Sequence, residues 1–102
     1  MIHVIADIEL HPGRRDAFLA EFRKLVPLVL AEDGCIEYGP AIDVPTGIGA
    51  QLPLRANGVT VVEKWQSVEH LKRHLDAPHM HDYRVAVRDM VVGTKLAVVE
   101  PA

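Results

Sequence analysis

The chain has 102 residues, a formal net charge of −3 and an apolar fraction of 49%. This length is typical of one domain, here spanning residues 1–102, that folds around its own core without metal or disulfide staples. Charged residues of both signs are interspersed, which excludes the basic surface of proteins that bind nucleic acid or an anionic membrane.

Residues 2–10 predict the first strand, because apolar side chains recur at every second position. His11-Pro12-Gly13 then supplies turn residues that end it. From Arg14 to about Ala31 the apolar period lengthens to that of an amphipathic helix packed on a sheet. Pro27 is expected to kink the last turn of this helix, and Gly34 marks its end. The apolar face of the strand comprises Ile2, Val4, Ala6, Ile8 and Leu10, and that of the helix comprises Phe18, Phe22, Leu25 and Val29.

A second strand is expected between Cys35 and Val44, with Ile36 and Tyr38 on one face. The irregular stretch from Pro45 to Gly58 follows, and its length indicates a functional flap, an interface arm or a tolerated surface insertion. A third strand runs from Val59 to Trp65 and is rich in β-branched residues. One of its faces carries Val59, Val61, Glu63 and Trp65.

Ser67 is predicted to cap a second helix. Pro78 interrupts this helix, and helical periodicity resumes near His79. After Gly93, residues Thr94–Glu100 predict a fourth strand. The apolar stripes of the two helical pieces comprise Val68, Leu71 and Leu75, and then Met80, Tyr83, Val87 and Met90.

This order, β-α-β-β-α-β, predicts an α+β fold of the ferredoxin-like kind, with a four-stranded antiparallel sheet and both helices on one face. The helices cannot cover the second face, yet the last strand is apolar on both sides. An apolar sheet face without cover requires a partner. We therefore expect a homodimer formed by sheet-on-sheet packing, a dimeric α+β barrel.

Four of the six histidines lie between positions 70 and 81: His70, His74, His79 and His81. His70 and His74 share one helical face and could bind zinc, copper or nickel. No cysteine or fixed carboxylate spacing completes such a site, so we predict no metal. Acid–base catalysis by His74 or His79 is a second interpretation, because the pKa of histidine lies near neutrality. Solvated histidines on a helix surface are the third interpretation, and spacing alone favours it.

Glu63 and Trp65 form the other candidate constellation. A carboxylate on an otherwise apolar strand face is costly unless it is paired or hydrogen-bonded. In one interpretation Glu63 bonds to a backbone donor or an arginine, and Trp65 fills the core. In the other, Trp65 is the wall of a cavity in which Glu63 orients a nearby histidine. Tyr38 on the neighbouring strand either adds its hydroxyl to that cavity or packs across the strands.

The chain contains no glycine-rich phosphate loop, dinucleotide fingerprint or Ser/His/Asp set with a recognisable elbow, so we expect no cofactor. Cys35 is the only cysteine, which excludes an internal disulfide and fits a reducing compartment. The first residues lack the pattern of a signal peptide, and no apolar run is long enough to span a membrane. These features predict a cytoplasmic protein.

Four segments, spread over about residues 2–100, occur in an order and spacing that is more specific than any one of them. They are Pro12-Gly13-Arg14 before a helix with Phe18, Ala31-Glu32-Asp33-Gly34-Cys35-Ile36-Glu37-Tyr38, Val62-Glu63-Lys64-Trp65, and His74-Leu75-Asp76-Ala77-Pro78-His79. Together they resemble the antibiotic biosynthesis monooxygenase (ABM) domain family, which includes cofactor-independent quinol monooxygenases.

The resemblance implies a dimer of ferredoxin-like subunits, each with a pocket between sheet and helices. The implied reaction is the oxygenation of a small dihydroxy-aromatic molecule, such as a quinol, by O2 without metal or flavin. In this reaction His74 or His79 would remove a phenolic proton, with Glu63 as a further catalytic candidate. The apolar pocket would keep water from the reactive intermediate. The residues expected to contact the substrate are Trp65, Tyr38, Phe22 and Tyr83.

Haem-degrading relatives use an asparagine, a tryptophan and a histidine, whereas the only asparagine here is Asn57 in the loop, which argues against haem. Some monooxygenase members place an asparagine near the tryptophan, where this chain has Val61 and Val62. Two other functions stay open because this fold hosts several chemistries. They are a non-catalytic dimeric module that binds a small aromatic molecule, and an isomerase of a small oxygenated metabolite.

Overall fold

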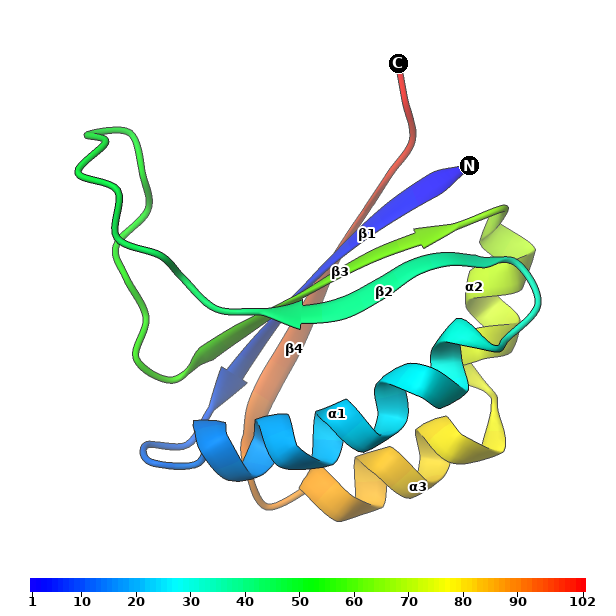
Figure 1. Cartoon of the computed structure of the whole chain (residues 1–102), viewed down its shortest axis with the longest axis horizontal. Coiled ribbons are helices and arrows are strands. Elements are labelled where there is room, and N and C mark those ends of the chain that lie inside the picture. Colours follow the sequence, from blue (N-terminus) through cyan, green and yellow to red (C-terminus); the bar gives the residue numbers. More distant parts are fainter.

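The computed structural model describes residues 1–102 and contains four strands and three helices. In chain order they are β1 (Ile2–Leu10), α1 (Arg15–Leu30), β2 (Cys35–Ala41), β3 (Gly58–Trp65), α2 (Val68–Leu75), α3 (Pro78–Val87) and β4 (Val91–Val99). The strands form one antiparallel sheet in the order β2-β3-β1-β4. Helices α1 and α3 lie side by side on one face of the sheet (Figure 1). This architecture confirms the predicted ferredoxin-like α+β fold.

The core lies between the sheet and the helices, and it is built by the two periodicities of the sequence. Every second residue of β1 is buried, from Ile2 to Leu10. The stripe of α1 packs against this face, and Phe18 and Phe22 are at most 1% exposed. Burying a large apolar side chain stabilises the fold by roughly 1.5–3 kcal/mol. The predicted inward face of β3 is confirmed, because Val59, Val61, Glu63 and Trp65 are all buried.

Strand β4 begins earlier than the sequence predicted, at Val91 instead of Thr94. Gly93 lies inside the strand and pairs with Glu9 of β1. The ladder with β1 therefore continues through the glycine, and an irregularity between Glu9 and Leu10 lets it reach Val91. The expected boundary at Gly93 was wrong because cross-strand pairing outweighs the weak strand preference of glycine.

Ile36 does not share a face with Tyr38, contrary to the prediction. Cys35 pairs with Trp65 and Glu37 pairs with Lys64, so two steps along β2 match one step along β3. This bulge makes Ile36 the extra residue, and its side chain is 49% exposed. Tyr38 remains on the inward face beside its partner Glu63 and is buried.

The break between α2 and α3 is fixed by local chemistry at both helix starts. The Ser67 hydroxyl accepts a hydrogen bond from the backbone N–H of His70 at 3.3 Å, so Ser67 caps α2 as predicted. Pro78 occupies the first turn of α3, where its missing N–H costs nothing. The turn between the helices brings the end of α2 and the start of α3 to the same end of the sheet (Figure 1).

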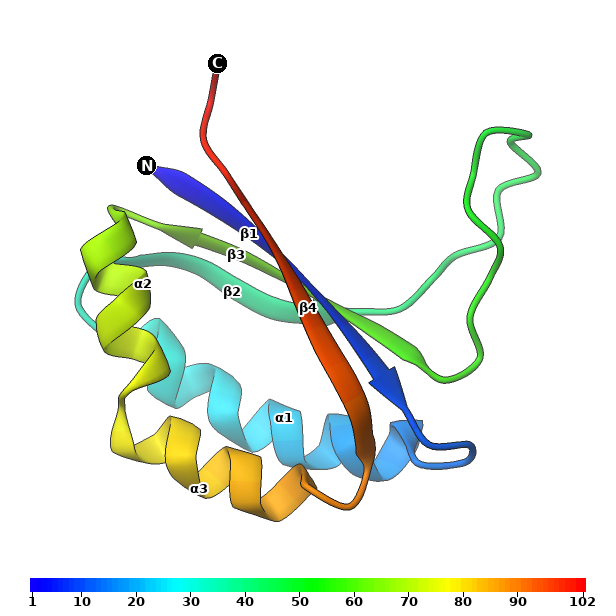
Figure 2. The same cartoon turned by 180° about the vertical axis from the view of Figure 1, so that it is seen from behind.

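Residues 42–57 between β2 and β3 extend away from the body of the molecule (Figures 1 and 2). The base of this loop is fastened by Arg55, whose guanidinium donates to both carboxylate oxygens of Asp43, at 2.9 and 3.0 Å, and also to Asp7. Ile48 and Leu52 near its tip are 66% and 84% exposed. Strand β2 ends at Ala41, so the loop begins before the predicted Pro45, and Gly58 belongs to β3.

The second face of the sheet carries no helix (Figure 2). Ile5 lies on this face, 40% exposed, and pairs directly with Val62 of β3 and Ala97 of β4. Directly paired residues project from the same side of a sheet, so these three form an apolar patch at its centre. No helix has the length and apolarity needed to cross a membrane.

Candidate active site

A cavity of about 400 Å³ lies between the sheet and α3. Its lining is mostly apolar and comes from β1, β2, β3, β4 and all three helices. Five of the residues predicted from the sequence to form a site line it: Phe22, Tyr38, Glu63, His74 and Tyr83. A few polar groups in a largely apolar cavity of this size are typical of a small-molecule site.

His74, on the last turn of α2, is only 1% exposed. Its imidazole packs on the indole of Trp65, with ring centroids 4.6 Å apart, and edge-on to Tyr38 at 5.4 Å. Trp65 is fully buried and does not line the cavity, so it supports His74 from behind. The two aromatic rings hold the imidazole in one orientation at the cavity wall.

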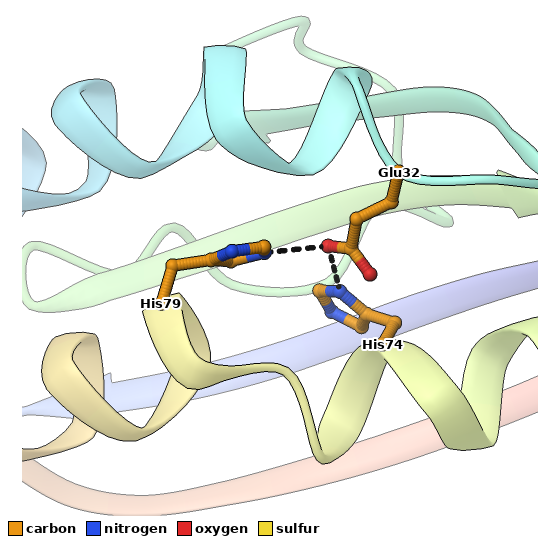
Figure 3. A group of neighbouring side chains, drawn as sticks. All are labelled: Glu32, His74 and His79. Carbon is orange, nitrogen blue, oxygen red and sulfur yellow. Dashed lines mark hydrogen bonds and ion pairs between the residues drawn. The ribbon is translucent and has the colours of Figure 1, made fainter.

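Glu32 completes the site, and sequence reasoning missed its role. Its Oε2 lies 2.8 Å from Nδ1 of His74 and 2.8 Å from Nε2 of His79 (Figure 3). The three residues come from the turn after α1, the end of α2 and the start of α3. The carboxylate is therefore a shared hydrogen-bond acceptor at the point where the three helix ends meet.

The carboxylate fixes which nitrogen of His74 carries the proton. A carboxylate can only accept a hydrogen bond, so His74 donates its Nδ1–H to Glu32. Burial lowers the pKa of His74, and the hydrogen bond and charge of Glu32 act in the opposite direction. A neutral imidazole with Nδ1–H leaves the lone pair on Nε2 for a molecule in the cavity that His74 lines.

His79 lies outside this cavity. It is 24% exposed at the side chain and lines a separate groove with Lys24, Asp82 and Tyr83. It is linked to the cavity only indirectly, because Glu32 contacts both His79 and the cavity-lining His74. Of the two histidines proposed from the sequence as bases, only His74 lines the cavity.

Glu32, His74 and His79 also form a donor set that could hold a divalent metal, since two imidazoles and a carboxylate suit zinc or iron. The oxygen of Glu32, however, itself lies at hydrogen-bond distance from both rings. The metal pair considered from the sequence, His70 with His74, is not formed. His70 instead hydrogen-bonds Ser67 at 2.6 Å and lies 3.5 Å from Asp33.

Glu63 is a buried carboxyl at the cavity wall. Burial raises its pKa to about 7, although the indole N–H of Trp65, which donates to Oε1 at 2.9 Å, acts in the opposite direction. Its hydrogen-bond partner is thus Trp65 and not a histidine. The orienting role suggested for Glu63 belongs by geometry to Glu32. With a pKa near neutrality, Glu63 can donate or accept a proton in the cavity.

Three aromatic rings form one wall of the cavity. Phe22 stacks on Tyr38 with centroids 5.5 Å apart and meets Tyr83 edge-on at 5.7 Å. Burial raises the pKa of both tyrosines above the usual value, so both phenols stay protonated at neutral pH. They offer flat apolar surface and hydrogen-bond donors to an aromatic ligand.

The lining of the cavity also includes two cations, which the sequence pattern did not indicate. Arg84 and Arg88 line it from α3 and the residue after α3, and Thr94 lines it from β4. The sequence pattern alone predicts that both arginines are solvated helix residues. Only the tertiary structure shows that they line the cavity.

Cys35 is half-buried beside the site. Burial, together with the charges of Glu32 and Glu63, raises the pKa of its thiol to about 11. The thiol is therefore protonated at neutral pH and lacks the thiolate character of a reactive cysteine.

Comparisons with known proteins agree with this fold. The sequence profile of the family "Antibiotic biosynthesis monooxygenase" matches residues 1–86. The Escherichia coli protein "Probable quinol monooxygenase YgiN" is 38% identical over 103 residues, covering 99% of this chain and 98% of that protein. A conserved Methanosarcina mazei protein superposes with a TM-score of 0.83 at 20% identity, over 99% of this chain and 92% of that one. Rv0793 from Mycobacterium tuberculosis gives 0.80 at 24% identity, over 99% and 94%.

The structural similarities support the fold, and the profile and the E. coli relative extend over the segments that carry Glu32, Glu63, His74 and His79. The chain therefore belongs to the antibiotic biosynthesis monooxygenase family and is an enzyme of that monooxygenase class.

Proposed function

We propose that this enzyme oxygenates a small dihydroxy-aromatic molecule, a quinol, with O2, and that His74 is the base that starts the reaction. The observation that carries the proposal is the buried imidazole of His74 at the wall of an apolar cavity, with Nδ1 bonded to Glu32. The name of the E. coli relative, a quinol monooxygenase, supports the same substrate class.

The first step is a proton transfer. A phenolic hydroxyl of the substrate gives its proton to Nε2 of His74, and the imidazolium that forms is stabilised by the carboxylate of Glu32. Positioned general bases of this kind contribute roughly 10²- to 10⁴-fold to the rate. The substrate is left as a phenolate, which is a far better reductant for O2 than the phenol.

Oxygen then reacts with the electron-rich ring. An electron passes from the phenolate to O2, the resulting radical pair combines, and the ring carries a peroxide. Cleavage of the O–O bond leaves one oxygen atom on the ring and releases the other as water, with His74 returning its proton. In total one quinol and one O2 give one hydroxyquinone and one water, so no external reductant is consumed.

The cavity supports these steps in two ways. Its apolar lining excludes water, which would otherwise protonate the phenolate or quench the peroxide. The protonated phenols of Tyr38 and Tyr83 can donate to oxygen atoms that become negative during the reaction. Glu63 is a second acid–base group on the same wall, beside Tyr38 in the sheet.

We also propose that a second copy of this chain covers the open face of the sheet. The patch formed by Ile5, Val62 and Ala97 is central, apolar and without cover in a single chain. Packing two such faces together removes both from water. The exposed apolar residues of the loop 42–57 are further candidates for contact with that copy.

The test is O2 consumption by metal-stripped protein with a panel of hydroquinones and dihydroxynaphthalenes, compared with autoxidation. Wild type should consume O2 faster than the blank, and 18O2 should label the ring of the product. His74→Ala should lose about 10²-fold or more. His81→Ala, an exposed histidine on α3, is the matched control and should retain activity.

No O2 uptake with any quinol, together with tight binding of the same compounds, would favour the non-catalytic binding module. Conversion of a substrate to a product of unchanged mass would favour the isomerase. Uptake that His74→Ala does not affect would remove the proposed base while leaving the reaction class intact.

A further inference from the structure

The lining of the cavity combines acid–base groups with two cations. Glu63, His74 and Tyr38 line it, and so do Arg84 and Arg88. The two arginines are one helical turn apart, so their side chains leave the helix on the same face. They are the only arginine or lysine side chains that line the cavity.

Neither guanidinium is neutralised by the protein. No carboxylate lies within 4.0 Å of Arg84 or Arg88, whereas Lys24, Arg55, Lys64 and Arg73 each have such a partner. Arg84 donates Nη2–H to the carbonyl of Leu75 at 2.7 Å, which fixes its guanidinium beside the cavity. Two unpaired cations thus face one mostly apolar cavity in a chain with a net charge of −3.

Arg84 lies near the base. Its guanidinium bonds to the carbonyl of Leu75, the residue after His74. Burial lowers the pKa of His74, and the charge of Arg84 acts in the same direction. Arg88 is one helical turn further along the chain, about 6 Å along a helix axis. A carboxylate on the same aromatic ring system as the hydroxyl at His74 can therefore reach Arg84, and the longer reach to Arg88 is within the length of an arginine side chain.

We propose that Arg84 and Arg88 form an anion subsite that binds a carboxylate carried by the aromatic substrate. The substrate class is then an aromatic dihydroxy acid, with its hydroxyl at His74 and its carboxylate at the arginines. A guanidinium fork matches a carboxylate with two parallel hydrogen bonds, and cavity walls of low dielectric strengthen the attraction. This inference rests on the proposed function only in taking the cavity as the substrate site.

The alternative role for the arginines is to stabilise the negative charge that forms on the reacting phenolate or on oxygen. Arg84 is fixed at the end of α2, beside His74, by its bond to Leu75, so it lies within reach of either a substrate carboxylate or the reacting oxygen. The two roles differ in what they predict for a substrate without a carboxylate.

The experiment measures binding, so that it does not depend on turnover. The probes are 1-hydroxy-2-naphthoic acid and its methyl ester, which has the same ring without the charge, titrated by calorimetry. Wild type should bind the acid at least 10-fold more tightly than the ester, and added salt should reduce this ratio. The ratio should fall about 10-fold or more in Arg84→Gln/Arg88→Gln. Arg88→Lys should keep part of it, because lysine retains the charge without the fork.

Arg23→Gln is the matched control, since it removes one exposed positive charge from α1, and it should leave the acid-to-ester ratio unchanged. Equal affinity of wild type for acid and ester would overturn the proposal. An equal loss of acid and ester affinity in the double variant would also overturn it. Arginine-dependent binding of the acid without any O2 uptake would support the subsite while refuting the proposed reaction.

Discussion

Glu32 and His74 are 42 residues apart in the chain, yet Oε2 of the glutamate lies 2.8 Å from Nδ1 of the imidazole. The pair joins the turn after α1 to the last turn of α2. It holds the imidazole in the form whose Nε2 lone pair is free for the cavity. The contact between Glu32 and His74 gives the first prediction.

Glu32→Gln should lower kcat by about 10²- to 10⁴-fold. The amide can donate to Nδ1 of His74 and so move the ring proton to Nε2, where it blocks the base. Loss of the carboxylate charge also lowers the pKa of His74 further, since Glu32 is the group that raises it. Asp33→Asn removes an exposed neighbouring charge and is the control. Retention of wild-type kcat in Glu32→Gln would show that the carboxylate does not orient the base.

His79→Ala should reduce kcat far less than His74→Ala, by roughly 3- to 10-fold, because it removes one hydrogen bond to Glu32 and leaves the base in place. The acid limb of the pH profile of kcat/KM should persist, since it reports His74. Its midpoint should lie below pH 6.5, because burial lowers the pKa of His74 from that value. If His79→Ala were as inactive as His74→Ala, His79 would have a direct part in the proton transfer.

Glu63 should make the stability of the fold depend on pH. Burial raises its pKa from 4.5 to about 7, so the folded state holds the proton more tightly than the unfolded state. Stability is therefore highest below pH 4.5, falls as the pH rises to about 7, and then changes no further through this group. Glu63→Gln mimics the protonated form, and its free energy of unfolding should exceed that of wild type by at most about 3 kcal/mol at pH 8.

Urea unfolding at pH 4, 6 and 8 measures this difference. The difference in unfolding free energy between Glu63→Gln and wild type should be near zero at pH 4, where Glu63 is protonated. It should grow as the pH rises, because wild type then carries a buried charge that the variant lacks. Glu9→Gln, on the exposed side of β1, controls for the loss of a negative charge. A difference that is the same at all three pH values would mean that Glu63 stays ionised in the fold.

The sequence predicted the sheet and its inward face because period two is a local property. The alternation along β1, and the face of β3 with Val61 and Glu63, needed no knowledge of the tertiary structure. The site was only partly predictable. Its histidines follow Ser67 in one local stretch, but the partner of His74 comes from a different helix, and no local spacing encodes that contact.

Failures of prediction have the same origin. Ile36 was assigned to the wrong face because the bulge in β2 depends on pairing with β3. The cationic part of the cavity lining was missed because the sequence pattern places Arg84 and Arg88 on a solvent-exposed helix face. Only the tertiary structure brings these two residues to the cavity lining.

The dimer is tested at the centre of the open face. Ile5→Lys places a charge between Val62 and Ala97, where a second copy would bury it without a partner. Light scattering coupled to size exclusion should give twice the chain mass for wild type and the chain mass for the variant. Val85→Lys introduces the same charge at an apolar residue of α3 that is 63% exposed, and it should remain dimeric. A monomeric wild type would refute the interface.

Gly34 connects stability to the site, because it lies two residues after Glu32 and has φ of +80°. A Cβ there would lie 2.2 Å from the ring of His70 on α2. Gly34→Ala should therefore lower the free energy of unfolding by more than the roughly 1–2 kcal/mol of left-handed strain alone. Gly13→Ala isolates that strain, since Gly13 has the same φ and open space around it. His70→Ala should recover part of the loss in Gly34→Ala, and equal losses for both glycines would exclude the clash.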